Sequence, residues 1–153
     1  MNLRRLFSLV LRLGLGGLFI LAGVLKLQDP TKFALEISNY QLVTFGTSIM
    51  ATLLPPVEIV AGAALIVLPR VWRQAGSLLI LLMVIMFSVA VSSAYFRGIN
   101  IDCGCFGGAA SPITALTLVR NAGLLLASIL CLKLNALPGP VTLAAPSSFK
   151  KWP

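Results

Sequence analysis

The chain has 153 residues, 58% of them hydrophobic and 10% charged, and its mean hydropathy is +0.99. Soluble domains carry roughly a quarter charged residues, so this composition excludes a soluble globular domain and indicates an integral membrane protein in contact with the lipid bilayer. The net charge of +8 comes from basic residues that flank apolar runs, which argues for membrane topology and against a nucleic-acid partner, and the absence of histidine removes histidine-ligated haem and most zinc catalysis.

The first apolar run follows Arg4 and Arg5 and begins like a signal peptide. Arg12 interrupts the run, however, and no small-residue cleavage site closes it. We therefore expect an uncleaved first span at residues 9–27, with Arg12 snorkelling back to the headgroups. The small residues of this span, where a neighbouring helix can approach closely, are Gly14, Gly16, Gly17, Ala22 and Gly23.

A polar connection follows at residues 26–45. Its pattern suggests either a short amphipathic helix on the membrane surface or a solvated loop helix, and we favour the solvated helix. The second span covers residues 47–68 and contains Pro55-Pro56, which either kink the helix or begin a shorter one. Both alternatives place Glu58 in the outer half of the span.

The third span covers residues 75–96 and is apolar apart from a few serines. Ser111-Pro112 predicts a helix start, with serine as the N-cap and proline at the first helical position. The fourth span therefore covers residues 112–134. The fold class is an all-α membrane protein, a four-helix transmembrane bundle at residues 1–137, followed by an expected disordered cytoplasmic tail at 138–153.

The orientation of this bundle follows from counting basic residues at its two ends. With the N-terminus inside, eight basic residues lie at cytoplasmic ends: Arg4, Arg5, Arg12, Arg70, Arg73, Lys133, Lys150 and Lys151. Four lie on the outer side: Lys26, Lys32, Arg97 and Arg120. This excess predicts that both termini are cytoplasmic. In a bacterial inner membrane the loop between the third and fourth spans then faces the oxidising periplasm.

That loop carries the chemically distinctive stretch of the chain, Asp102-Cys103-Gly104-Cys105-Phe106-Gly107-Gly108. Two thiols one residue apart can form a disulfide, hold a soft metal or pass electrons between partners. Gly104 allows the bend that brings the two sulfurs together. A Cys-x-Cys disulfide closes a very small ring, and strained disulfides are the reducible ones. Cys131, far along the fourth span, is expected to be a packing residue.

Charged residues inside the spans suggest a polar site beneath this loop. Arg120 would lie about 12 Å along the fourth helix, at a depth comparable to that of Glu58. Charges within a bilayer are costly and usually face a partner in the bundle interior. We therefore expect Glu58 and Arg120 to pair, with Asn121 beside them. A nearby arginine would also favour the reactive thiolate of Cys103 or Cys105.

With these residues placed, the chain resembles the MauE branch of the DoxX-like membrane proteins, over about residues 12–134. The residues that carry the resemblance are Gly17-Leu18-Phe19, Ala22-Gly23-Val24-Leu25-Lys26-Leu27, Pro56-Val57-Glu58 with Gly62, Cys103-Gly104-Cys105-Phe106-Gly107 and Arg120-Asn121. The resemblance implies a four-helix membrane bundle associated with redox chemistry. MauE-like members are linked to maturation of a disulfide-rich periplasmic amine dehydrogenase in methylamine utilisation, and DoxX-like relatives to quinone-coupled sulfur oxidation.

Two hypotheses of different classes follow. In the first, Cys103 and Cys105 form the reactive pair of a thiol–disulfide oxidoreductase that exchanges with a periplasmic partner or client. Glu58, Arg120 and Asn121 would then tune protonation or hold the head group of a membrane quinone. In the second, the protein is a non-catalytic membrane scaffold whose cysteine pair staples the loop or holds copper. The sequence leaves open the client, the direction of electron flow and the oligomeric state.

Overall fold

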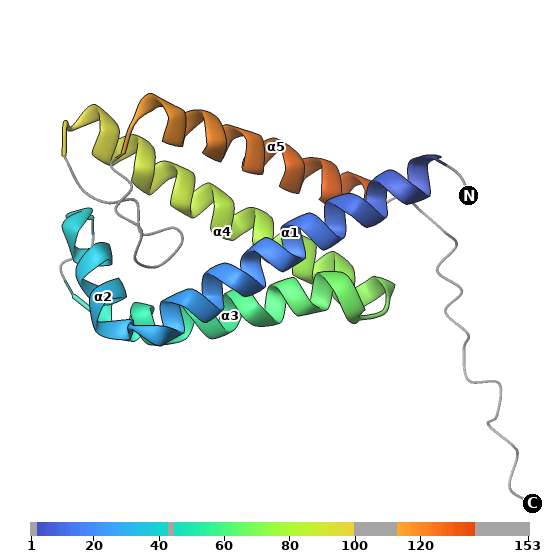
Figure 1. Cartoon of the computed structure of the whole chain (residues 1–153), viewed down its shortest axis with the longest axis horizontal. Coiled ribbons are helices and arrows are strands. Elements are labelled where there is room, and N and C mark those ends of the chain that lie inside the picture. Colours follow the sequence, from blue (N-terminus) through green and yellow to red (C-terminus); the bar gives the residue numbers. More distant parts are fainter. Residues whose placement is uncertain (1–2, 43–44, 100–112, 137–153) are drawn as a thin grey trace, which may run out of the picture.

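The computed structural model describes residues 3–42, 45–99 and 113–136. In these ranges the chain forms helices and no strand: α1 (Leu3–Gln28), α2 (Pro30–Asn39), α3 (Thr47–Val67), α4 (Arg70–Phe96) and α5 (Ala115–Ala136) (Figure 1). All of them except α2 are long and apolar enough to cross a membrane. The predicted all-α membrane fold is therefore confirmed.

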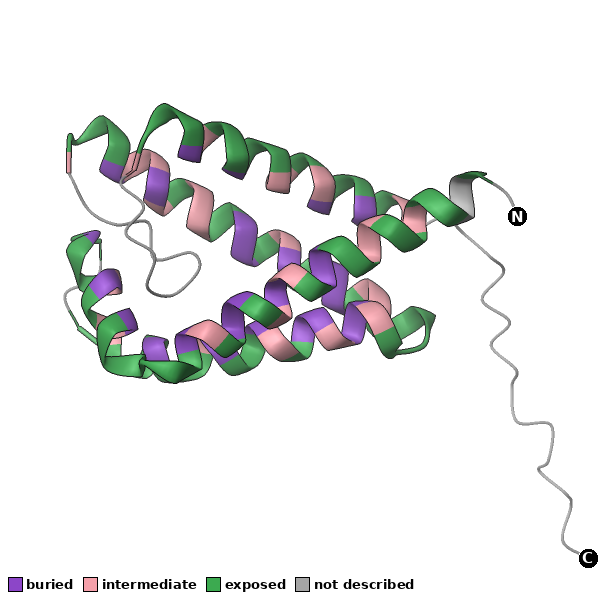
Figure 2. Cartoon of the chain, in the orientation of Figure 1, coloured by how far each residue is buried: buried purple, intermediate pink, exposed green. Residues whose placement is uncertain are grey.

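The four long helices run up and down beside one another, and α2 lies at one end of the bundle (Figure 1). The most extensive contacts join α1 to α3 and α4 to α5, and α3 also packs against α4. Buried residues lie on the helix faces that point inward, while the outward faces are exposed (Figure 2). In a bilayer those exposed apolar faces would contact lipid, which is why so many large hydrophobic side chains remain uncovered in the isolated chain.

Two glycines set how closely α1 and α3 approach each other. A Cβ atom added to Gly16 would lie 2.9 Å from the carbonyl oxygen of Gly62, and one added to Gly62 would lie 2.6 Å from the carbonyl oxygen of Gly16. Gly23 meets the carbonyl oxygen of Pro55 at 2.7 Å in the same way. Gly14 and Gly17 meet nothing within 4 Å. The small residues expected at a helix contact therefore serve that purpose at Gly16 and Gly23.

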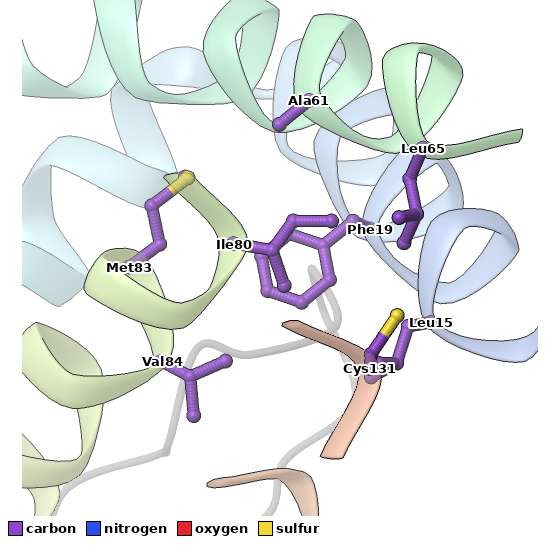
Figure 3. Packing of buried hydrophobic residues seen from close by; sticks show 8 residues of the cluster. All are labelled: Leu15, Phe19, Ala61, Leu65, Ile80, Met83, Val84 and Cys131. Carbon is purple, nitrogen blue, oxygen red and sulfur yellow. The ribbon is translucent and has the colours of Figure 1, made fainter. Parts of the chain in front are cut away.

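Side chains from all four long helices meet in one apolar core (Figure 3). The buried members of the cluster are Leu15, Phe19, Ala61, Leu65, Ile80, Met83, Val84 and Cys131. Cys131 is 1% exposed, and its Sγ accepts a hydrogen bond of 3.5 Å from Nδ2 of Asn135. Its surroundings are those of a small packing side chain, as the sequence suggested.

Helix α2 begins at a regular N-cap. The Asp29 carboxylate accepts hydrogen bonds from the Lys32 backbone N–H at 2.9 Å and the Thr31 hydroxyl at 2.6 Å, and Pro30 occupies the first turn. The hydroxyl of Thr31, followed by the N–H of Lys32, lowers the pKa of Asp29. The helix is not the solvated loop helix that we favoured, because Phe33 and Glu36 are buried against the bundle.

Helix α3 is continuous through Pro55-Pro56, so the alternative in which a new helix begins there is wrong. As a result Glu58 lies near the middle of the span and not in its outer half. Helix α4 begins at Arg70, five residues before the expected span, directly after Pro69, whose extended backbone prevents α3 from continuing. Helix α5 begins at Ala115, and neither Ile113 nor Thr114 before it is helical, so the predicted start of the fourth span at residue 112 is wrong. The expected cap at Ser111-Pro112 and the tail at 138–153 lie outside the described residues.

Arg12 has a structural partner inside the protein. Its Nε donates to the carbonyl oxygen of Leu65 at 3.1 Å, and its Nη2 donates to that of Ile66 at 3.1 Å. These carbonyls belong to the last turn of α3, where helix geometry leaves them without an intrahelical donor and concentrates negative partial charge. The sequence did not predict this partner: the side chain of Arg12 caps α3.

Candidate functional site

A buried ion pair joins α1 to α3. The Nζ of Lys26 lies 2.5 Å from Oε1 of Glu58, and the two residues are 4% and 6% exposed. Side chains on a helix lean toward its N-terminus. Because α1 and α3 are antiparallel, Lys26 leans into the bundle from the end of α1 while Glu58 leans outward from the middle of α3. The two side chains therefore meet at a depth in the bundle between those of their backbone positions.

Aromatic rings from two other helices surround the same ammonium group. The Nζ of Lys26 lies 5.0 Å from the ring centroid of Phe33 on α2 and 6.0 Å from that of Phe87 on α4. A cation within about 6 Å of an aromatic face is attracted by its quadrupole. Lys26 is thus held by a carboxylate and two aromatic rings, with elements α1, α2, α3 and α4 all contributing.

Beside the pair lies a cavity of about 60 Å³ lined by α1, α3, α4 and α5. Its polar wall is made by Lys26, Glu58, Arg120 and Asn121. Its apolar wall consists of Leu18, Phe19, Ala22, Leu54, Met83, Val84, Met86, Phe87 and Leu124. The structure thus brings the three predicted polar residues to one cavity and adds Lys26 to them.

The predicted pairing of Glu58 with Arg120 is corrected by this geometry. The carboxylate bonds Lys26, whereas Arg120 lies on the cavity wall with an exposed side chain. Sequence reasoning assigned Lys26 to the outer polar connection because Gln28, Asp29 and Pro30 follow it closely. The helical spacing nevertheless indicated that Lys26 points into the bundle. It shares one face of α1 with three buried residues, Phe19, Ala22 and Gly23.

Two buried polar atoms at the cavity have no hydrogen-bond partner in the part of the chain that the structure describes. They are Oε2 of Glu58 and Nδ2 of Asn121, which is 5% exposed. One is an acceptor and the other a donor. A water needs roughly 10–15 Å³ of such space, so the cavity has room for several waters that could satisfy both atoms.

A quinone ring does not fit this cavity. A cavity that takes up benzene measures roughly 150 Å³, more than twice the volume beside Glu58. The polar groups match water in size and in hydrogen-bonding character. The residues proposed from the sequence to hold a quinone head group therefore do not accommodate one here.

Cys103 and Cys105 lie outside the described residues, but the points where their segment joins the fold are described. Ile99 and Ile113 both pack on a small cluster that contains Tyr40, Val91 and Ala94 and is bordered by Phe87. Phe87 is also a wall of the cavity. Ile99 and Ile113, the described residues that flank this segment, therefore lie near the polar cavity.

The α2 end of the bundle is tied together by Arg97. Its Nη1 donates to the carbonyl oxygen of Tyr40 at 3.2 Å, and its Nη2 donates to Oε1 of Gln41 at 3.0 Å. The Tyr40 ring packs edge-on against Phe87, with ring centroids 6.3 Å apart. Arg97 thus fixes the end of α2 to the end of α4. Among the described residues no group of three or more His, Cys, Asp or Glu side chains could hold a metal ion.

Comparison with known proteins identifies the family of this chain. A family model described as methylamine utilisation protein MauE matches residues 4–134. A methylamine utilization protein MauE of Paracoccus denitrificans is 32% identical over 114 residues, which are 72% of this chain and 60% of the relative, so the chain spans about three fifths of that protein's length. No solved structure matches the chain. With a family match over nearly all of its described residues and four helices of spanning length, the chain is a multi-pass membrane protein that belongs to the MauE family of methylamine utilisation proteins.

Proposed function

We propose that this protein is a thiol–disulfide redox protein of a bacterial inner membrane, where it supports maturation of a periplasmic enzyme of the methylamine dehydrogenase type. Membership of the MauE family supports the link to methylamine utilisation. The observation that carries the redox role is the Cys103-Gly104-Cys105 sequence in the segment between α4 and α5. Both ends of that segment join the bundle beside the buried polar cavity.

The proposed reaction is a thiol–disulfide exchange. A thiolate of the client attacks one sulfur of the Cys103–Cys105 disulfide, so that the intramolecular S–S bond breaks and a mixed disulfide forms. The second client thiolate attacks the mixed disulfide and completes the client's own disulfide. The two electrons and two protons lost by the client now reside on the thiols of Cys103 and Cys105. Exchange with a second disulfide of a periplasmic carrier returns the pair to its oxidised form, and no quinone is required.

Growth on methylamine tests this proposal in a strain that depends on the protein. Cys103→Ser and Cys105→Ser should each abolish growth and active dehydrogenase while the protein remains in the membrane at normal abundance. Each single variant keeps one thiol but lacks the resolving sulfur, so it should accumulate a mixed disulfide that is visible on non-reducing gels. Cys131→Ala is the matched control, because that cysteine is buried in the core, and it should support growth.

A redox titration of the purified protein adds a second measurement. Exchange partners have potentials of about −120 to −270 mV, whereas structural disulfides lie below about −300 mV. We expect the pair to titrate in the first range. Full growth of the Cys103→Ser/Cys105→Ser variant would show that the cysteines are not the active pair, and a very negative potential would favour a staple in the scaffold hypothesis.

A further inference from the structure

A second polar pocket lies on the other side of Lys26. It has a volume of about 140 Å³ and is formed between the end of α1 and helix α2. Asp29, Lys32 and Glu36 line it, together with Lys26 itself. Lys26 therefore lines two pockets: the outer pocket at the α2 end of the bundle, and the inner cavity between the long helices.

Glu58 lies on the inner-cavity side of Lys26. Its Oε1 bonds Lys26, its buried Oε2 has no partner among the described residues, and the residue lines the inner cavity. Asn121, whose buried Nδ2 also has no partner among the described residues, lines the same cavity. An acceptor and a donor at one small cavity match a water molecule, which donates to the carboxylate and accepts from the amide.

The charges around Glu58 favour a neutral occupant over an ion. From α1 the carboxylate faces Lys26, and α5 adds Arg120 to the cavity wall. From α4 the residues that line the cavity are apolar, Met83 and Phe87 among them. The α2 charges Lys32 and Glu36, and Asp29 just before the helix, face Lys26 in the outer pocket. Two cations disfavour a bound cation, and the carboxylate disfavours an anion.

We propose that Glu58 is a proton-binding site at mid-membrane, reached by water from the α2 end through the outer pocket and past Lys26. A hydronium ion in the outer pocket gives its proton to the Glu58 carboxylate, by way of water, and is left as water. The Nζ of Lys26 lies beside this carboxyl group and over the faces of Phe33 and Phe87. Proton binding at this site involves neither Cys103 nor Cys105.

Infrared spectroscopy of the purified full chain in a detergent without carbonyl groups tests proton binding. The chain has only four Asp and Glu residues, so the band of a protonated carboxyl group can be assigned. We expect such a band to appear as the pH of the sample is lowered. It should be lost in Glu58→Gln and retained in the control Asp102→Asn, which changes a carboxyl group of the segment between α4 and α5. The Lys26→Met/Glu58→Gln variant, which leaves no unpaired lysine, should also lack the band.

Thiol labelling tests the route. Ala22→Cys places a thiol at the inner cavity, Leu25→Cys places one at the outer pocket, and Val24→Cys places one on the exposed outer face of α1. A small hydrophilic thiol reagent should modify the first two in membranes and leave the third unmodified, with adducts assigned by mass spectrometry. A Glu58 band that does not change with pH would overturn the proton site. Ala22→Cys as inert as Val24→Cys would overturn the route.

Discussion

An ionised lysine and an ionised glutamate inside a bilayer are costly to desolvate, and the cost is recovered only when the pair is well placed. Lys26 and Glu58 meet this condition through their short contact and the two aromatic rings at the ammonium group. Arg120 is exposed and lies at the same cavity. Because Lys26 is buried and Arg120 is exposed, we expect the two residues to contribute differently to the stability of the bundle.

Removal of one member of the buried pair should destabilise the bundle strongly. Lys26→Met leaves Glu58 without its cation and should lower the free energy of unfolding by about 3–5 kcal/mol. Lys26→Met/Glu58→Leu should lose much less than the sum of the single changes, because no unpaired charge remains. Unfolding in SDS, followed by circular dichroism, measures the free energy of unfolding of Lys26→Met, Glu58→Leu and the double variant.

A second double-mutant cycle combines Arg120→Leu with Glu58→Leu and serves as the matched comparison. Because the structure pairs Glu58 with Lys26, the coupling of Arg120 to Glu58 should be the smaller of the two. Equal or greater coupling to Arg120 would restore the pairing that the sequence suggested and would contradict the contact found here.

Tyr40 provides a pH-dependent test outside the spans. Burial, with a further effect of the Glu36 carboxylate and against the opposing effect of Arg120, raises the pKa of Tyr40 from 10.0 to about 12. The folded protein therefore favours the neutral phenol more than the unfolded chain does. This contribution to stability is complete below pH 10 and is lost as the pH rises toward 12.

Ultraviolet titration of tyrosinate formation should show a component near pH 12 that Tyr40→Phe lacks. Tyr40→Phe should also lose less stability than the wild type between pH 10 and 12, because phenylalanine has no proton to release. Identical alkaline unfolding curves for the two proteins would argue against a buried, neutral Tyr40.

At the scale of elements, the close contact between α1 and α3 depends on glycines, which have no side chain to separate the helices. Gly62→Ala would place a methyl group 2.6 Å from a backbone carbonyl oxygen of α1, so the helices must separate. Overpacking of this kind costs about 1–3 kcal/mol. Gly17→Ala is the matched control, since its Cβ meets nothing within 4 Å. Thermal melts in detergent should show a lower midpoint for Gly62→Ala and no loss for Gly17→Ala. The same loss in both variants would show that the effect does not come from the contact of Gly62 with α1, because alanine has the higher helix propensity and would by itself stabilise the helix.

At the scale of the whole molecule, the long helices place the N-terminal end of α1, the turn between α3 and α4 and the end of α5 together, opposite α2 (Figure 1). The distribution of arginine and lysine predicts that this shared end is cytoplasmic. Green fluorescent protein fused after residue 153 should therefore fluoresce, and alkaline phosphatase fused there should be inactive.

Labelling tests the opposite end of the molecule. An impermeant maleimide should modify reduced Cys103 or Cys105 from the periplasmic side of intact cells. Labelling only after the inner membrane is opened would reverse the orientation and place the cysteines in a reducing compartment.

The sequence by itself determined the class of the fold. Four apolar runs of spanning length, only 10% charged residues and prolines or polar residues between the runs are sufficient for an all-α membrane bundle, because hydrocarbon requires every spanning backbone group to be bonded within its own helix. The sequence also indicated that Glu58 and Asn121 belong to a polar interior, since isolated charges within a span must face inward. The cysteine pair stays a prediction from local spacing alone.

The tertiary structure decided which charges are partners. Local pattern placed Lys26 in a polar connection and Arg12 at the headgroups, yet Lys26 bonds Glu58 and Arg12 caps α3. Both contacts join residues more than thirty positions apart, as the separation of 32 between Lys26 and Glu58 shows. They depend on the register in which Gly16 meets Gly62 and Gly23 meets Pro55. That register is set by the fit of two helix surfaces, which no single helix contains, and so the ion pair, its cavity and the burial of α2 exist only once the helices have packed.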